Sequence, residues 1–380
     1  HNRHKMIKKI LKNIFKVFSY SLFFAIYGKV KKSISANDDD RVKIKKIEIE
    51  KNLIYQVYSI DCGRLYTDRI QDTAALVNKS IIEEASFQLR YTKDSRIYNG
   101  KINENVVFRK GTPRMLKKLD GTVLSLLTGG GGNNNYWHWL VDVLPRIGLC
   151  SKTFNLREVD YFLLPDNIKK FQKETLDLLN IEKNKRLSSK KYRHIKTKNL
   201  IVTDHPVVVS GDATKDTHNI PAWIIYWLRE TFLNKNKTNK DKNKTKIYID
   251  RGESINDYQT KRLISNEEEV KNYLLKNNFT IVKLHEIDFS KQVDIFNNVD
   301  CVVGLHGAGL TNLVFCRPKT KVIEFRNKNA GPMYENLSKK NNLNYFSIIC
   351  ESRQIQKFNH PNQQGSIEIS IQTLDKILKG

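Results

Sequence analysis

Apolar residues follow two kinds of spacing in this chain, one typical of strands and one typical of helices. From residue 42 to 110 they form short β-rich runs separated by turn residues, as in NLIYQVYSI and NVVFRKG, which predicts a β-rich entry region. Beyond residue 120, strand-like runs such as VDYFLLP and NLIVTDHP alternate with helical patterns such as IKKFQKETLDLLNI and PAWIIYWLRETFL. Strands that alternate with helices favour a parallel sheet with helical crossovers, which is an α/β fold.

The second half of the chain repeats this alternation. KIYIDRG, FTIVKLHE and KVIEF predict strands, and SNEEEVKNYLLKNN predicts a helix with Ser265 as N-cap and Glu268 in the capping-box position. Between the halves, residues 234–245 are almost purely Lys, Asn and Thr, which is typical of a linker. We therefore expect two α/β domains, residues 41–233 and 246–380, with a cleft between them and ligands at the carboxyl ends of the strands.

The N-terminal residues 1–40 have a different pattern. MIKKILKNIFKVFSYSLFFAIYGKVKK places basic residues on both sides of an apolar, aromatic centre, and its charge-free part, residues 17–28, is too short to cross a bilayer. This favours a basic amphipathic helix that lies on an anionic membrane surface, so we expect a peripheral membrane protein. A short type II membrane anchor, a signal peptide and an ordinary core helix remain open alternatives.

The charge and the cysteines narrow the function classes only a little. The net charge of +26, from 66 Lys and Arg against 40 Asp and Glu, suits nucleic acid, an anionic membrane or anionic substrates, although an AT-biased genome also produces such Lys- and Asn-rich sequences. The chain lacks an RNA-recognition signature, zinc-finger spacing and a basic heptad region, so we expect no nucleic-acid partner. The 5 cysteines include no CxxC pair, which favours a reducing compartment such as the cytoplasmic face of a bacterial membrane.

The stretch VVGLHGAGLTN, residues 302–312, predicts a strand, a glycine turn and a helix that begins at Leu310. Its order of glycines is the reverse of the dinucleotide-binding fingerprint. A turn of this kind leaves the first N–H groups of the helix free for a diphosphate, although the glycines could serve the turn alone. His306 is open to three interpretations, a phosphate contact, a core histidine and a zinc ligand, of which the last lacks a second ligand nearby.

Two further stretches carry candidate chemistry. Arg251 and Arg262 lie at a strand end and before the next helix, where guanidinium groups would clamp phosphate oxygens or simply lie on the surface. His138 and Asp142 are four residues apart in NNNYWHWLVDVLPRI, so they lie on one helix face, where the carboxylate would fix the imidazole tautomer of a general base. A buried structural His–Asp pair is the alternative, and Trp137 would pack the helix or stack on a sugar.

These three stretches, in this order, resemble glycosyltransferase family 61. The family includes plant xylan-decorating transferases, animal enzymes that add N-acetylglucosamine to protein, and many bacterial members. NYWHWLVDVLPRI, YIDRGESINDYQTKRLISNEEEV and VVGLHGAGLTNLVFCRPKTKVIEF carry the resemblance over roughly residues 120 to 330. The segment DCGRLYTDRIQDTAAL resembles bacterial members more loosely.

The resemblance implies a GT-B type fold, in which two Rossmann-like domains face each other across a cleft and the C-terminal one holds the nucleotide-sugar. It implies inversion at the anomeric carbon, with His138 or Asp142 as the base. The residues expected on the acceptor side are Asn135, Trp137 and Arg146. The residues expected to bind the donor are Arg251, Arg262, His306, Gly307, Ala308, Gly309, Leu310, Thr311, Asn312 and Glu324, the last through the ribose.

We therefore expect the protein to transfer a sugar from a nucleotide-diphosphate donor, which we expect to be UDP-linked, to a glycan acceptor. The reaction would belong to cell-surface polysaccharide or lipopolysaccharide synthesis. We expect no required cofactor and no metal site, because no Asp-x-Asp motif lies at a strand end; a divalent ion would at most stimulate. The alternatives are a non-catalytic nucleotide- or carbohydrate-binding protein of the same fold and another phosphate-handling transferase, for which the P-loop motif is missing.

Overall fold

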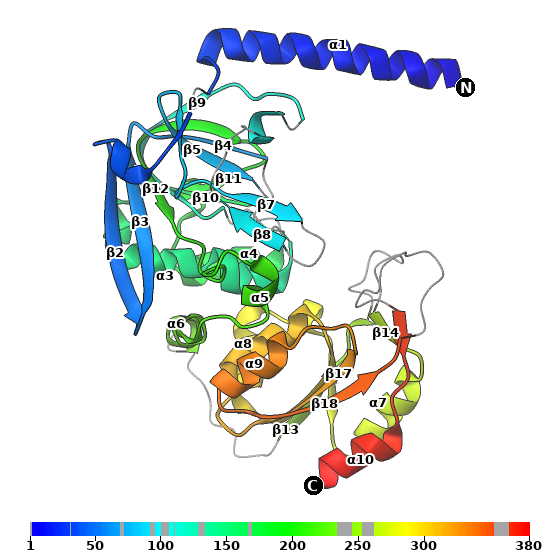
Figure 1. Cartoon of the computed structure of the whole chain (residues 1–380). Coiled ribbons are helices and arrows are strands. Elements are labelled where there is room, and N and C mark those ends of the chain that lie inside the picture. Colours follow the sequence, from blue (N-terminus) through cyan, green and yellow to red (C-terminus); the bar gives the residue numbers. More distant parts are fainter. Residues whose placement is uncertain are drawn as a thin grey trace. The chain divides into compact units, whose positions relative to one another are not determined.

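The chain forms two compact units. The computed structural model describes residues 2–30, 32–68, 72–91, 96–99, 106–109, 111–127, 134–165, 169–233, 245–252, 262–352 and 365–380. The first unit comprises His1–Asn167 and Ile181–Thr214, and the second comprises Ile168–Asn180 and Lys215–Gly380. Each unit has its own sheet (Figure 1), so the predicted α/β class is confirmed. The predicted linker, residues 234–245, lies outside the described residues except for Thr245, which begins a strand.

The first unit is built on a ten-stranded mixed sheet. Its strands follow the order β1-β6-β5-β4-β12-β9-β10-β11, and the hairpin β2–β3 joins the sheet because β3 pairs with β12. The strands β2 to β5 pair in antiparallel fashion, whereas β9 pairs in parallel with both β10 and β12. The strands are β1 (Lys32–Ile34), β2 (Val42–Glu50), β3 (Leu53–Asp61), β4 (Arg64–Thr67), β5 (Thr73–Val77), β6 (Ser80–Ile82), β9 (Lys117–Ser125), β10 (Tyr161–Leu164), β11 (Arg186–Ser188) and β12 (His194–Thr203). A separate hairpin pairs β7 (Gln88–Tyr91) with β8 (Arg96–Asn99).

The register of this sheet aligns its apolar residues into one core. Leu200 of β12 lies opposite Ile60 of β3 on one side and Val123 of β9 on the other, and all three side chains are fully buried. Strands expose alternate side chains to opposite faces, so residues paired in register share a face and pack together. The predicted β-rich region, residues 42–110, supplies β2 to β8 and is confirmed.

The other short elements of the first unit connect these strands. They are η1 (Ala36–Asp38), η2 (Val106–Arg109), α2 (Tyr136–His138), the π-helical turn η3 (Trp139–Val143), α3 (Pro145–Ser151), η4 (Leu156–Glu158) and η5 (Lys183–Lys185). Helix α5 (Ala213–Thr217) begins at the end of this unit.

The second unit is built on a parallel five-stranded sheet in the order β15-β13-β16-β17-β18. The strands are β13 (Thr245–Ile249), β15 (Thr280–Val282), β16 (Val299–Leu305), β17 (Lys321–Asn327) and β18 (Asn344–Cys350), and β14 (Arg262–Ile264) pairs separately with β19 (Gly365–Ile367). Across this sheet, the strands are therefore the second, first, third, fourth and fifth of the five in chain order. The direction of winding changes between β13 and β16, and open α/β sheets bind ligands at the carboxyl ends of the strands at such a point.

Helices cover both faces of the second sheet (Figure 1). On one face Val270 and Leu274 of α7 and Leu374 of α10 share a buried cluster with Val303 and Ile323 of the sheet. Elsewhere Phe232, Phe289 and Phe315 form an aromatic cluster that joins α6, α8 and η9, with ring centroids 4.9 to 6.4 Å apart. The helices of this unit are α4 (Lys170–Leu178), α6 (Ala222–Leu233), α7 (Glu267–Lys276), η8 (Leu284–Glu286), α8 (Phe289–Asn298), η9 (Ala308–Phe315), α9 (Met333–Lys340) and α10 (Ile371–Lys379).

Two predicted helix starts are wrong. Helix α7 begins at Glu267, and its N-cap residue Asn266 makes no side-chain cap bond to the helix N–H groups. Ser265 does not occupy the N-cap position, and its hydroxyl donates to the Ile367 carbonyl of β19 at 3.3 Å. The helix expected from Leu310 is a 3₁₀ helix that begins two residues earlier, at Ala308.

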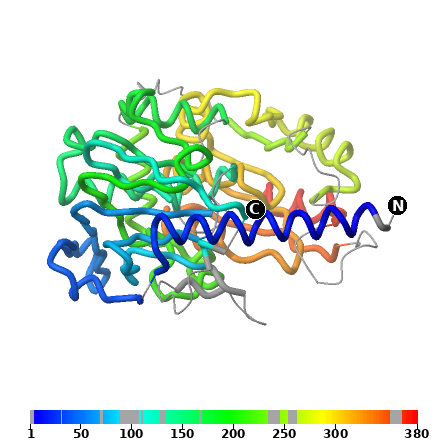
Figure 2. Tube along the Cα trace, turned by 90° about the horizontal axis from the view of Figure 1, so that it is seen from above, coloured from blue at the N-terminus to red at the C-terminus, as the bar shows by residue number. Residues whose placement is uncertain are grey.

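Helix α1 (Asn2–Tyr27) is a single unbroken helix in both views of the chain (Figure 1, Figure 2). Near its C-terminal end Phe23 is buried against Tyr66 and Phe108 of the first unit, with ring centroids 5.9 Å apart in each pair. Most of the preceding helix is exposed, including Leu11, Phe15 and Phe18. By length and composition His4–Tyr27 suffices to cross a membrane, a weak indication because a signal sequence would pass the same test.

Candidate functional site

In the first unit, the segment that carries His138 and Asp142 begins with a helix cap and contains a widened turn. The Asn135 side chain accepts from the N–H groups of Trp137 and His138 at 2.9 and 3.4 Å, and so it caps α2. The N–H of Leu144 donates to the Trp139 carbonyl at 3.1 Å, which is the i to i−5 bond of a π turn. Pro145 explains this turn, because it lacks an N–H and its ring crowds the carbonyl four residues earlier.

The predicted His138–Asp142 pair is present. Nδ1 of His138 lies 2.6 Å from Oδ2 of Asp142, and the Asp142 side chain is buried whereas 28% of the His138 side chain is exposed. Burial opposes ionisation of Asp142, but attraction to His138 and its hydrogen bond, with weaker contributions from His205 and Arg146, hold the pKa of this carboxyl below its ordinary value. An ionised Asp142 accepts from Nδ1–H of neutral His138, which leaves the lone pair on Nε2 to accept a proton.

The other residues predicted on the acceptor side lie around this pair. Arg146 is fully buried, and its Nε donates to the Asp142 carbonyl and its Nη1 to the Thr203 carbonyl, both at 3.2 Å. Its guanidinium lies 5.3 Å from the centroid of the Phe87 ring. Trp137 is buried, whereas Asn135 is exposed. Arg146 therefore ties helix α3 to the end of β12 and to Phe87.

Sequence reasoning missed Asp204 and His205, which follow β12 directly. Nδ1 of His205 accepts from the N–H groups of Val207 and Val208 at 3.1 and 3.0 Å, so its proton is on Nε2. Burial lowers the pKa of His205 to about 3, although the Asp142 carboxylate opposes this shift. Burial raises the pKa of Asp204 to about 6. Their position after a buried strand was the signal in the sequence.

In the second unit, the predicted arginines converge at the switch point between β13 and β16. Arg262 Nη1 donates to the His306 carbonyl at 2.9 Å, and Arg251 Nη1 lies 3.5 Å from the Arg262 carbonyl oxygen. A Cβ placed on Gly307 would lie 3.5 Å from both Cζ and Nε of Arg251. The two arginines therefore meet at the turn between His306 and η9.

In this position the charged form of both guanidinium groups is less stable than in water. Burial, together with repulsion by Arg262, lowers the pKa of Arg251 to about 10. Burial likewise lowers the pKa of Arg262. Both groups stay cationic at neutral pH, so an anion bound between them would relieve their repulsion and replace lost solvation.

The turn itself presents backbone rather than side chains. Ala308 and Gly309 are half-buried, whereas Leu310, Thr311 and Asn312 are buried. The Thr311 hydroxyl donates to the Ala308 carbonyl at 2.6 Å, and Asn312 Nδ2 donates to Gln292 Oε1 at 3.0 Å. A ligand at this turn would therefore meet the first N–H groups of η9, which have no acceptor within the helix.

His306 and Glu324 form a sealed pair behind this turn. His306 Nδ1 is hydrogen-bonded to Glu324 Oε1, and the Tyr345 hydroxyl donates to Glu324 Oε2. The Glu324 side chain is completely buried, and the Tyr334 ring packs against His306 with centroids 5.1 Å apart. Because Glu324 is completely buried, contact with a ribose would need the surrounding side chains to move.

Asp250 stabilises the loop that follows β13. Its Oδ1 accepts from the Gly252 N–H at 2.8 Å, and its Oδ2 lies 3.1 Å from Lys271 Nζ. Across the described part of the chain, no group of three or more His, Cys, Asp and Glu side chains is placed to hold a metal ion.

Comparison with known proteins indicates the family of this chain. Residues 136–323, about half of the chain, match the family model described as Glycosyltransferase 61. The match begins at the helix that carries His138 and ends one residue before Glu324. The chain is also similar to an EGF domain-specific O-linked N-acetylglucosamine transferase from Gallus gallus, with 35% identity over 65 residues, which are 17% of this chain and 12% of that protein. The chain belongs to the glycosyltransferase 61 family.

Proposed function

We propose that this protein is a glycosyltransferase that moves a sugar, with inversion, from a nucleotide-diphosphate donor to a glycan acceptor. The observation that carries the proposal is the convergence of Arg251 and Arg262 on Gly307, at the switch point of a parallel sheet and within the residues that match the family. Nucleotide phosphates bind at such points through guanidinium groups and helix N–H groups.

The proposed chemistry is a single in-line displacement. Nε2 of His138 takes the proton of an acceptor hydroxyl, whose oxygen forms a bond to the anomeric carbon. The bond from that carbon to the diphosphate breaks, and the electron pair stays on the diphosphate. Arg251, Arg262 and the first N–H groups of η9 stabilise the added negative charge.

Asp142 and Arg146 have positioning roles in this mechanism. Asp142 fixes the tautomer of His138 and stabilises the imidazolium that forms when the proton arrives. Arg146 is too deeply buried to touch an acceptor, and we assign it to holding Asp142 and Phe87 in place. Glu324 holds His306, whose carbonyl in turn holds Arg262. The arrangement of the two units as the two halves of a GT-B type enzyme belongs to this proposal.

A panel of nucleotide-sugars tests the proposal directly. We expect the protein to bind a nucleoside diphosphate, to release nucleotide slowly from one donor, UDP-linked by our proposal, and to do so faster with an acceptor glycan. The reaction should continue in EDTA, with at most a stimulation by manganese. Donor binding without any turnover would instead indicate a non-catalytic binding protein.

The membrane role of α1 is a separate part of the proposal. Its exposed apolar side chains and its lysines suit the interface of an anionic membrane, with the protein on the cytoplasmic face, and a type II anchor is the competing arrangement. Protein bound to anionic vesicles should be released by high salt or carbonate if α1 lies on the surface. Release by detergent alone would show a spanning helix.

A further inference from the structure

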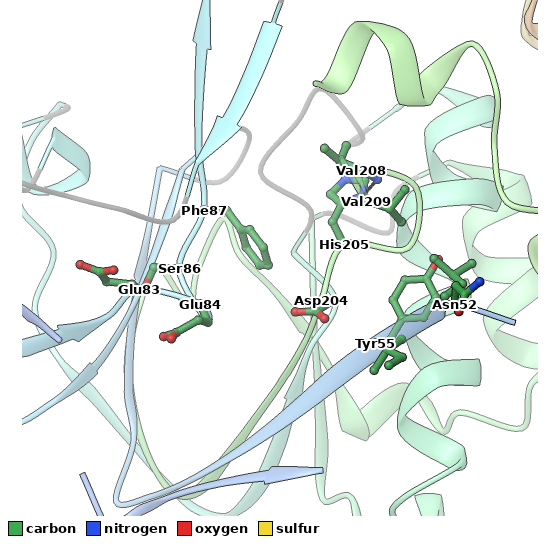
Figure 3. Close-up of a pocket in the computed structure, with 12 residues that line it drawn as sticks. Asn52, Tyr55, Glu83, Glu84, Ser86, Phe87, Asp204, His205, Val208 and Val209 are labelled. Atoms are coloured by element: carbon green, nitrogen blue, oxygen red, sulfur yellow. Dashed lines mark hydrogen bonds between the residues drawn. The ribbon is translucent and has the colours of Figure 1, made fainter. Parts of the chain in front are cut away.

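A cavity of about 450 Å³ opens in the first unit (Figure 3). Its walls come from the turn and start of β3, the segment before β7, and the loop after β12. Its volume falls in the range of small-molecule sites, about 300–1,000 Å³. The lining residues are Asn52, Leu53, Ile54, Tyr55, Glu83, Glu84, Ser86, Phe87, Asp204, His205, Val208 and Val209.

The cavity is acidic in a strongly basic protein. Three carboxylic acids line it, Glu83, Glu84 and Asp204, and its lining residues include neither Lys nor Arg. The whole chain, by contrast, carries a net charge of +26. An anionic group that entered would meet like charge with no cation in the wall, whereas hydroxyl and ammonium groups would find acceptors.

Asp204 presents its carboxylate to this space. Figure 3 shows Phe87 and Asp204 reaching into it from opposite walls. Asp204 Oδ2 accepts from the Gln56 N–H at 2.7 Å and Oδ1 from the Tyr58 hydroxyl at 3.2 Å. Each carboxylate oxygen can accept a second hydrogen bond, so Asp204 is fixed in position and still able to bind a ligand. Glu84 is engaged elsewhere, with the Ser35 hydroxyl and the Ala36 N–H.

The rim of the cavity is apolar. Ile54 and Val209, which are 56% and 49% exposed, lie among its lining residues. A sugar ring has the matching character, since its C–H faces pack on apolar side chains while its hydroxyl edge donates to carboxylates. An apolar rim over an acidic floor therefore suits one sugar unit better than a purely apolar ligand.

The cavity is connected to the proposed base through two of its lining residues. Phe87 lies against the Arg146 guanidinium, and Arg146 donates to the carbonyl of Asp142. The Asp142 carboxylate also raises the pKa of His205, against the larger effect of burial. Phe87 and Arg146 therefore link the cavity to the proposed base.

We propose that this cavity binds one sugar unit of the acceptor, and that this unit is neutral or carries a free amine rather than a carboxylate, phosphate or sulfate. The inference rests on the proposed function, because it assigns the acceptor of that reaction. Asp204 accepts hydrogen bonds from the hydroxyl or ammonium groups, and Ile54 and Val209 cover the ring. The cavity thus selects against acidic glycans.

Binding to the full chain without donor tests the cavity alone. The probes are N-acetylglucosamine, glucosamine, glucuronate and spermidine, each measured by ligand-observed NMR and titration. We expect the first two to bind and glucuronate to bind at least tenfold more weakly. Asp204→Asn, which keeps an acceptor for the Gln56 N–H, should weaken glucosamine binding about tenfold, whereas Asp120→Asn, at an exposed carboxylate of the same unit, should change nothing.

Val209→Lys is the second variant, because an exposed rim position tolerates the change. It should weaken glucosamine binding and strengthen glucuronate binding severalfold. Equal binding of glucuronate by the unchanged protein, binding of spermidine without either sugar, or indifference of both variants would overturn the inference. Sugar binding without any transfer would count against the proposed function and leave the cavity assignment intact. Transfer with an acceptor KM unaffected by Asp204→Asn and Val209→Lys would count against the cavity alone.

Discussion

The two units each contain a histidine paired with a carboxylate, and the pairs differ in access to solvent. In the first unit Asp142 is buried, but 28% of the side chain of its partner His138 is exposed. His306 and Glu324 are sealed inside the second unit, and a tyrosine hydroxyl fills the remaining carboxylate oxygen. A general base must reach its substrate, so only the exposed pair suits the proposed proton transfer, whereas the sealed pair suits a positioning role.

The surroundings of the pairs also differ in charge. The first unit holds an acidic cavity that Phe87 and Arg146 link to its pair, whereas the pair in the second unit lies behind two arginines. This difference would suit the proposed neutral acceptor and anionic donor. The large positive charge of the chain predicts neither site, since net charge affects solubility and steering more than local recognition.

The largest expected effect is on the exposed pair. His138→Ala removes the proposed base, so kcat should fall by roughly 10²–10⁴-fold, with the Kd for the donor unchanged. His285→Ala, at a half-exposed surface histidine, is the control. If His138→Ala retains full turnover while the protein transfers sugar, another group is the base.

Substitution in the sealed pair should lower the free energy of unfolding. His306→Phe leaves Glu324 buried with Tyr345 alone, which should cost roughly 3–5 kcal/mol of unfolding free energy. Denaturant unfolding of this variant and of His138→Ala measures the contrast. Equal destabilisation by the two variants would erase the distinction between the pairs.

A smaller effect is expected on donor affinity. Arg262→Ala removes a charge-assisted contact to phosphate, so the Kd for a nucleoside diphosphate should rise roughly 10- to 100-fold. Arg317→Ala, at an exposed arginine of the same unit, should leave the Kd unchanged. Calorimetric titration measures both values. An unaltered Kd in Arg262→Ala would show that the phosphate does not bind at this turn.

The smallest effect is a pH dependence of the first unit. Burial lowers the pKa of His194 from 6.5 to about 4, so the folded state holds this imidazole neutral. The resulting stability is present above pH 6.5 and is lost as the pH falls toward 4, by on the order of 2 kcal/mol. His194→Gln keeps a donor for the Arg114 carbonyl, to which Nδ1 now lies at 2.9 Å, and should flatten the curve of melting temperature against pH in this range. A curve as steep as that of the unchanged protein would assign the acid sensitivity elsewhere.

Local patterns in the sequence determined much of this molecule. The alternation of strands and helices fixes the α/β class, and spacing of four on a helix brings His138 to Asp142 even through a π turn. The strand and glycine turn at residues 302–312 were likewise readable, because neighbours in sequence decide such geometry. The start of η9 and the cap of α7 were not, because contacts from distant residues override local preferences there.

Tertiary structure alone decided which residues share a site. The strand order of the second sheet places β13 beside β16, and only this brings Arg251 and Arg262 to Gly307. Nothing in the sequence pairs Glu324 with His306, or sets Asp204 and His205 beside Asp142. Spacing along the chain fixes contacts within one element, whereas contacts between elements follow from how sheets and helices bury their apolar faces together.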